Sequence, residues 1–152
     1  MIKKILSSLL VIILLKGCGF TPIYSSNNKV TLNIKEINFV GDWETNNFIN
    51  NGLKRYSNNE AGKEYKLFVE SNYSKRATNK DSAGNITSYE GEIIVKMNLI
   101  SDDTDDNFLF KENFIVENYT DELEEKNYET SNKRNLVNII INKFMIKLSL
   151  QK

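Results

Sequence analysis

Residues 86–101 have the sequence ITSYEGEIIVKMNLIS, which alternates as a long β-strand does. Successive side chains of a strand point to opposite faces, so positions two apart share a face. From residue 93 to residue 99, one set of positions is wholly apolar: Ile93, Val95, Met97 and Leu99. The other set mixes apolar and polar side chains: Ile94, Lys96, Asn98 and Ile100. The first set predicts a strand face that lies against a hydrophobic core.

Two further strands flank this one along the sequence. The strand before it is predicted from alternating positions: Tyr65, Leu67, Val69, Ser71 and Tyr73. The polar stretch from Lys75 to Gly84 then predicts a hairpin loop. After residue 101, an acidic run over residues 102–106 predicts a turn. The next strand is predicted from apolar residues of one parity: Phe108, Phe110, Phe114 and Val116.

The chain before these strands predicts a first strand and a helix. The strand has one alternating face and an apolar continuation: Val30, Leu32, Ile34, Ile37, Phe39 and Val40. Gly41 breaks it, and Asp42 is suited to cap the helix that follows. That helix is predicted from its apolar face and its terminating residues: Phe48, Ile49, Leu53 and Tyr56, then Asn58, Asn59 and Gly62.

A second helix is predicted at the end of the chain. Ser131 is suited to cap it, and residues 121–129 before it are predicted to be a polar connection. The apolar face of the helix recurs at helical spacing: Val137, Ile140, Ile141, Phe144 and Leu148.

The resulting order β-α-β-β-β-α predicts an α+β fold with two layers. A four-stranded sheet with two helices on one face buries one side of every element. Hairpin connections make the last three strands antiparallel, whereas the helix between the first two strands makes them parallel through a right-handed crossover. We therefore expect a mixed sheet in a single domain that spans residues 29–152.

Composition restricts the function. Lys plus Arg and Asp plus Glu each number 20, so the formal net charge is zero and nothing favours a nucleic acid partner. Histidine is absent and Cys18 is the only cysteine, which removes histidine base catalysis, histidine zinc ligands and internal disulfides. Glycine spacing for binding phosphate is also absent. We expect no enzymatic activity, no cofactor and no metal site.

Two acidic clusters have a functional interpretation and a plainer one. Residues 102–106 could form a calcium loop, but the glycine and the distant bidentate glutamate of an EF-hand are missing. Glu122, Glu124 and Glu125 could supply a glycosidase carboxylate pair. Solvated carboxylates in a turn or on a polar face are commoner, and we favour that interpretation for both clusters.

The N-terminus has the layout of a secretory signal peptide over residues 1–17. Lys3 and Lys4 form the positive region, and the apolar run from Ile5 to Leu15 is interrupted only by Ser7 and Ser8. This run is shorter than the roughly 17–25 apolar residues of a membrane-spanning helix.

Cys18 directly follows this segment, and the residues Leu15-Lys16-Gly17-Cys18 resemble a bacterial lipobox. In that signal, Leu15 and Gly17 would guide a dedicated peptidase and the Cys18 thiol would receive diacylglycerol; Lys16 departs from the uncharged residue usual at its position. The alternative is a free or buried thiol or an intermolecular disulfide. If Cys18 carries the lipid, residues 18–28 form a lipidated tether.

The mature start Cys18-Gly19-Phe20-Thr21-Pro22-Ile23-Tyr24 resembles that of LptE-type lipopolysaccharide-assembly lipoproteins, and the predicted order of elements is similar to theirs. The resemblance implies an outer-membrane lipoprotein that occupies the lumen of the large β-barrel LptD and helps to deliver lipopolysaccharide to the outer leaflet. Gly19 would permit sorting to the outer membrane by resemblance to common sorting rules.

Within this implied function, the basic residues Lys75, Arg76 and Lys80 are candidates to contact lipopolysaccharide phosphates. The plainer interpretation is that they keep a hairpin soluble. A different function also stays open, in which the chain is a stand-alone envelope lipoprotein that binds a small ligand or another periplasmic protein.

Overall fold

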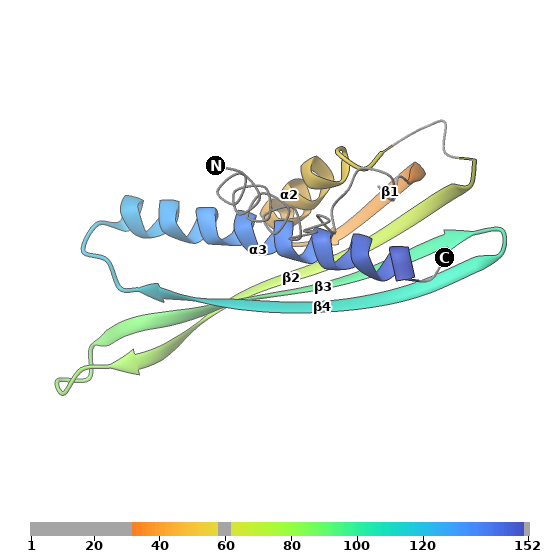
Figure 1. Ribbon diagram of the computed structural model, residues 1–152. Coiled ribbons are helices and arrows are strands. Elements are labelled where there is room, and N and C mark those ends of the chain that lie inside the picture. The colour runs from red at the N-terminus through yellow and green to blue at the C-terminus, as the bar shows by residue number, and fades with distance from the viewer. Residues whose placement is uncertain (1–31, 58–61, 151–152) are drawn as a thin grey trace, which may run out of the picture.

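The computed structural model describes residues 32–57 and 62–150 of the chain (Figure 1). The described elements follow the order β1 (Asn33–Gly41), α2 (Trp43–Leu53), β2 (Glu64–Lys80), β3 (Ile86–Ser101), β4 (Thr104–Glu117) and α3 (Glu122–Leu150). Residues 29–31 of the first predicted strand, including Val30, lie outside the described residues. In the described part of the chain, no helix is both long enough and apolar enough to cross a membrane.

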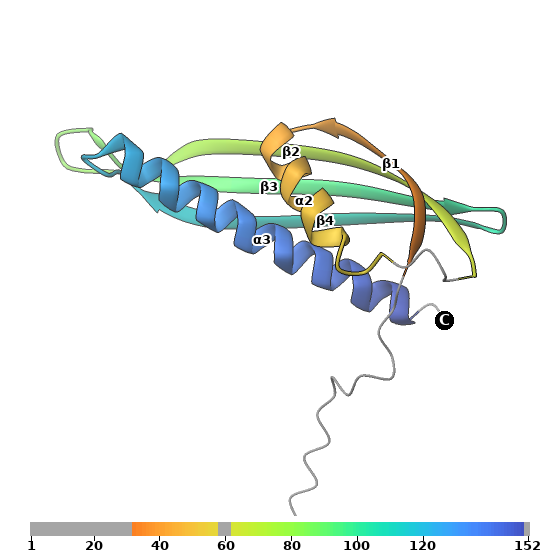
Figure 2. The ribbon, with the colours of Figure 1, turned by 90° about the horizontal axis from the view of Figure 1, so that it is seen from above.

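The four strands form one sheet in the order β1-β2-β3-β4. β1 and β2 are parallel, while β2 with β3 and β3 with β4 are antiparallel. Both helices cover the same face of the sheet, and the other face is left open (Figures 1 and 2). This arrangement confirms the predicted two-layer α+β fold with a mixed sheet.

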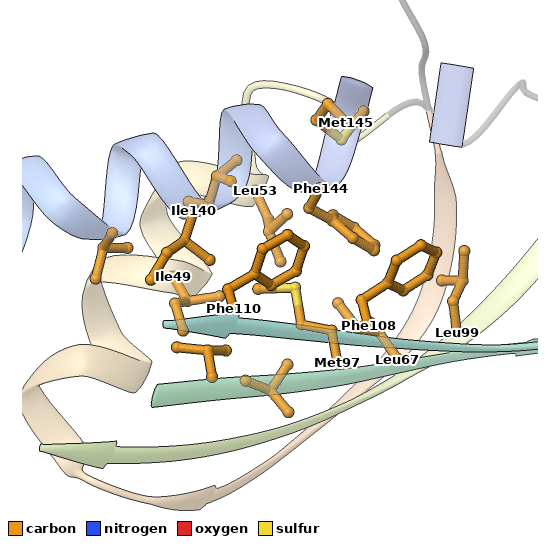
Figure 3. Packing of buried hydrophobic residues seen from close by; sticks show 14 of the residues in the cluster. Ile49, Leu53, Leu67, Met97, Leu99, Phe108, Phe110, Ile140, Phe144 and Met145 are labelled. Carbon is orange, nitrogen blue, oxygen red and sulfur yellow. The ribbon is translucent and has the colours of Figure 1, made fainter. Parts of the chain in front are cut away.

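The core lies between the sheet and the two helices. The predicted face of β3 supplies four of its fully buried side chains: Ile93, Val95, Met97 and Leu99. Phe144 of α3 packs edge-on against both Phe108 and Phe110 of β4, with ring centroids 5.1 and 6.4 Å away (Figure 3). Apolar residues from every strand and both helices thus meet in one cluster.

Two glycines bring backbone elements close together. Gly41 ends β1 with φ of 102°, and a Cβ atom there would lie 1.8 Å from the carbonyl oxygen of Ser71. Asp42 then caps α2 as predicted, because its Oδ1 atom accepts a hydrogen bond from the Thr45 backbone N–H at 2.8 Å. Gly52 lets α2 approach α3, since a Cβ atom at this position would lie 2.3 Å from Cδ1 of Ile141.

Helix α2 ends earlier than predicted, at Leu53 instead of near residue 58. The backbone N–H of Leu32 donates to the carbonyl oxygen of Tyr56 at 2.9 Å, and Leu32 also forms a bridge with Ser57. These contacts draw the residues after the helix toward the start of the sheet, so Tyr56 lies beyond the helix.

The hairpin loop predicted over residues 75–84 is wrong for most of its length. β2 continues to Lys80, and only residues 81–85 connect it to β3. The backbone N–H groups of Ala83 and Asn85 donate to Oδ1 of Asp81, and Gly84 has φ of 87°. Residues 75–80 stay in the strand because they pair with β3, although their side chains lack an apolar alternation.

The polar connection predicted over residues 121–129 is also wrong, because α3 begins at Glu122 and not after Ser131. Asp121 caps the helix, accepting a hydrogen bond from the Leu123 backbone N–H at 2.8 Å. Acidic side chains in the first turn stabilise the positive end of the helix dipole. Charge and capping therefore start this helix about four turns before its apolar face begins at Val137.

The acidic turn is shorter than predicted, since β4 already begins at Thr104. Lys63 forms an ion pair with Asp103 in this turn. No group of three or more acidic or cysteine side chains in the described part of the chain is arranged to hold a metal ion.

Candidate functional site

The predicted lipidation site lies outside the described residues. Cys18 and its motif residues Leu15 and Gly17 all precede residue 32. The folded domain therefore offers the predicted basic residues and the surfaces around them as its candidate functional groups.

Lys75 lies on β2 and its side chain meets α3. Its Nζ atom is 2.6 Å from Oε1 of Glu125 and 3.0 Å from Oε2 of Glu129, and it lies 4.7 Å from the centre of the Tyr89 ring. Burial acts to lower the pKa of Lys75, but the hydrogen bonds to both carboxylates outweigh it and raise that pKa. The charge of Lys75 is therefore neutralised within the fold.

Arg76 and Lys80 are placed differently from Lys75. Arg76 follows Lys75 in the strand and so points to the open face, where its guanidinium donates to Oε2 of Glu90 through Nε at 2.8 Å. Lys80 ends the strand, where its backbone pairs with Ile86, and its side chain has no ion-pair or hydrogen-bond partner among the described residues. The structure therefore does not gather the three predicted phosphate contacts into one site.

A partly buried ion-pair network continues from Lys75 toward α2. Lys133 of α3 has only 8% of its side chain exposed, and its Nζ atom lies 2.9 Å from Oε2 of Glu44 and 3.5 Å from Oε1 of Glu129. The hydroxyl group of Thr130 also donates to Glu44 at 3.1 Å. Glu129 thus links both lysines, and the network ties α3 to α2 and β2.

The aromatic ring of Tyr73 contacts this network through Lys133. Nζ of Lys133 lies 3.6 Å from the centre of the Tyr73 ring, which stacks on Phe114 of β4 with centroids 6.4 Å apart. The two rings meet across Gly91 of β3, where a Cβ atom would lie 2.6 Å from the Phe114 ring. A glycine is needed at this position because any side chain would separate or displace the rings.

The Tyr73 hydroxyl group is buried and makes no hydrogen bond of normal geometry with the described residues. Burial, and then the nearby Glu129 carboxylate, raise the pKa of Tyr73. Burial also acts to raise the pKa of Glu129, but Lys75 and the Tyr73 hydroxyl outweigh it and lower that pKa. Glu129 therefore stays ionised, and the network is a paired cluster of charges that orients α3.

The open face of the sheet carries its own series of ion pairs. They join neighbouring strands: Glu36 with Lys66, Glu70 with Lys96, Glu90 with Arg76, and Glu92 with Lys111. Each acidic residue has a basic partner, so this part of the face has no net charge. A shallow depression of about 230 Å³ lies around Phe68, with Val40 and the side-chain amides of Asn38, Asn98 and Asn107 at its border.

Sequence reasoning missed the buried network, although one signal for it was present. Lys133 falls four residues before Val137 and so continues the apolar face of α3 by one turn. A charged residue at such a position is buried only when it is paired. Its partners Glu44 and Tyr73 are 89 and 60 positions away, so the helix pattern alone does not identify them.

The fold has counterparts among solved structures. The rare lipoprotein B from Shewanella oneidensis matches with a TM-score of 0.56 at 9% sequence identity, over 76% of this chain and 95% of that one. The uncharacterized lipoprotein B from Nitrosomonas europaea matches with a TM-score of 0.55 at 10% identity, over 82% of this chain and 88% of that one. Bacterial lipoproteins share this fold.

These identities are low, so the likeness concerns the fold and not the role of individual residues. No protein-family model matches the chain, and no curated protein matches its sequence. The matched region nevertheless spans most of both lipoproteins, which makes the whole domain the shared unit.

Proposed function

We propose that this chain is an outer-membrane lipoprotein that fills the lumen of a large LptD-type β-barrel and helps it to assemble lipopolysaccharide in the outer leaflet. Cys18 would carry the lipid anchor. The observation that carries the proposal is the coincidence of two independent features, a Cys-Gly-Phe-x-Pro-x-Tyr start after a signal-like segment and a fold that bacterial lipoproteins adopt.

The shape of the domain suits a plug. β2 has 17 residues, which corresponds to a strand about 55 Å long. Beyond Ser71, the last residue that pairs with β1, the sheet continues as three strands, β2, β3 and β4, and only the turn beyond Asn79 and Ser88 extends past β4 (Figure 1). Large outer-membrane barrels have lumens wide enough to hold a folded plug.

The open sheet face suits a polar lumen wall. Barrel interiors are polar, unlike their lipid-facing surface. The paired charges and asparagines of the open face can exchange hydrogen bonds with such a wall without introducing a net charge. Recognition would then depend on shape and hydrogen bonding.

Direct contact with lipopolysaccharide is a narrower part of this proposal. Lys75 and Arg76 already neutralise carboxylates of the fold, so Lys80 at the hairpin end is the predicted contact best able to meet a phosphate. Replacing Lys80 with Glu should weaken binding of purified lipopolysaccharide, whereas Lys35→Glu at the opposite end should not. Unchanged binding after Lys80→Glu would remove Lys80 from the proposal.

The other predicted function, a stand-alone lipoprotein that binds a small ligand, would require a suitable pocket. Ligand sites usually enclose about 300–1,000 Å³. The depression at Phe68 is smaller, at about 230 Å³, and lies on an open sheet face. The depression at Phe68 therefore does not itself support a small-ligand site.

Purification from native membranes tests the proposal. The tagged chain should be extracted in mild detergent and its companions quantified by mass spectrometry. We expect one large β-barrel protein in near-equal amount. Recovery of the intact, lipidated chain without a barrel would overturn the proposal and favour the stand-alone lipoprotein.

A further inference from the structure

The C-terminal half of α3 exposes an apolar stripe that the fold does not cover. Ile139, Ile146 and Leu150 are 41%, 51% and 80% exposed. Their spacing of seven and then four residues places them on one face of the helix. Ile140 and Phe144 on the opposite face are fully buried, so α3 is apolar on both sides in this half.

The charges of α3 are separated along its length. Residues 121–129 contain five acidic side chains: Asp121, Glu122, Glu124, Glu125 and Glu129. Residues 130–150 contain no acidic side chain, and the basic residues Lys143 and Lys147 border one side of the exposed stripe. Lys143 pairs with Glu112 while staying half-exposed, and Nζ of Lys147 lies 5.1 Å from the Phe110 ring centre. Aliphatic side chains bordered by lysines are typical of helices that lie on an anionic lipid surface.

The start of the described chain lies beside this part of α3. Leu32 is hydrogen-bonded to the backbone of Tyr56, and the Tyr56 hydroxyl group donates to Oδ1 of Asn142 at 3.0 Å. Figures 1 and 2 show the start of β1 and the C-terminal end of α3 at the same end of the domain. Cys18 precedes Leu32 by 14 residues, a length that spans at most about 50 Å when fully extended. A lipid on Cys18 therefore holds Leu32 within about 50 Å of the membrane, on the same side of the domain as the C-terminal half of α3.

We propose that the exposed face of α3 formed by Ile139, Ile146 and Leu150 lies on the phospholipid surface of the membrane that holds Cys18. This inference rests on the lipid anchor of the proposed function. The aliphatic side chains enter the interface, and Lys147, whose ammonium group has no carboxylate partner among the described residues, meets lipid phosphates. The β2–β3 hairpin at the far end of the domain stays free to enter a barrel, so one molecule can make both contacts (Figure 1).

The test uses the full mature chain, with lipidation verified by mass spectrometry, in vesicles of phosphatidylethanolamine and phosphatidylglycerol. The lipidated Cys18 thiol is blocked, so Ile146→Cys provides a single site for an environment-sensitive fluorophore. Leu109→Cys on the open sheet face is the matched control, because Leu109 is 61% exposed and lies on another element. Both preparations are floated with the vesicles before measurement.

We expect blue-shifted emission at position 146 and at least about a twofold loss of fluorescence when brominated lipids are included, with little change at position 109. Quenching at position 146 that is absent, or no greater than at position 109, would overturn the inference in floated, lipidated protein. Either water or a second copy of the chain would then cover this face. A chain that carries no lipid would overturn both the anchor and the inference.

A second variant separates this inference from the proposed function. Ile139→Asn, Ile146→Asn and Leu150→Asn together change only exposed positions, and circular dichroism should confirm an unchanged fold. We expect this triple variant to abolish the lipid quenching measured from a label at position 149, an exposed serine in the same turn, and to leave recovery of the barrel unchanged. Loss of the barrel would instead assign the stripe to the barrel and overturn the lipid contact, while the proposed function would stand.

Discussion

The ammonium group of Lys133 lies 3.6 Å from the centre of the half-buried Tyr73 ring, and the Lys133 side chain is shielded from water. A cation over an aromatic face is stabilised more strongly when it is desolvated. Glu44 and Glu129 supply the opposing charge, so this contact joins α2, α3 and β2. It fixes the N-terminal half of α3 on the long hairpin.

Replacing Lys133 with Met should therefore destabilise the domain. The change leaves Glu44 and Glu129 partly buried without this partner, and breaking a buried ion pair from one side costs about 3–5 kcal/mol. We expect a loss of about 2–4 kcal/mol, because Lys75 still pairs with Glu129. Urea unfolding followed by circular dichroism measures the loss, with Lys66→Met in an exposed pair as the control. Equal midpoints for the two variants would show that the network does not stabilise the fold.

The close approach of α2 to α3 predicts that a second substitution offsets the loss of stability caused by a first one. Gly52→Ala places a methyl group 2.3 Å from Cδ1 of Ile141, and overpacking of this kind costs about 1–3 kcal/mol. Ile141→Val removes that Cδ1 atom, so the double variant should be more stable than the sum of the two single changes predicts. Gly62→Ala is the control because a Cβ atom there meets nothing within 4 Å. Strict additivity of the two changes would contradict the close contact.

The pKa of Glu129 predicts how stability depends on pH. This pKa lies below the ordinary 4.5 in the folded state, because Lys75 and Tyr73 outweigh the effect of burial. A lowered pKa stabilises the fold above the unfolded-state pKa, and this contribution disappears as the pH falls through the folded-state value. Lys75→Met should therefore cost about 1–2 kcal/mol near pH 7 and progressively less below pH of about 4.5.

Urea midpoints of the original chain and the Lys75→Met variant, measured from pH 7 down to pH 3, check this dependence. Lys35→Met serves as the control, since Lys35 and Glu64 form an exposed pair that should contribute under about 1 kcal/mol. A constant difference between the original chain and Lys75→Met at all pH values would contradict the assignment to the carboxylates.

The predicted lipid site can be checked in cells. Cys18→Ala should abolish incorporation of labelled palmitate and move the chain from the membrane fraction to the soluble fraction, because several acyl chains hold a protein far more firmly than one. Lys16→Ala keeps the cysteine and should keep the label. Continued labelling of the Cys18→Ala chain would show that another residue carries the lipid.

Apolar periodicity was enough to predict the layers and most of the strands. The alternation in β3 identified its core face, and the helix between β1 and β2 correctly implied a parallel pair. Periodicity failed at residues 75–80 and 122–130, where the side chains are mostly polar. Order there comes from strand pairing and from ion pairs such as Lys75 with Glu125, which are 50 residues apart. A local pattern carries no information about such a pair.

For the candidate functional residues, too, local sequence features could be recognised and contacts between distant residues could not. The cysteine motif was visible in the sequence because it is local, whereas the arrangement of the basic residues was not. Lys75 and Arg76 are adjacent in sequence, yet they point to opposite faces of β2 and bind different carboxylates. Their assignment to a hairpin loop was wrong because the strand continues through them.

The central claim is that the hairpin end of the domain lies inside a barrel, and site-specific photo-crosslinking in living cells tests it most directly. Ile115 lies opposite Glu90 on the open face, toward the hairpin end, and is 47% exposed. A photoreactive amino acid at this position should yield one adduct with a large β-barrel protein, and a probe at Leu150 should yield none. Absence of a barrel adduct from Ile115, in a chain that is lipidated and membrane-bound, would contradict the account.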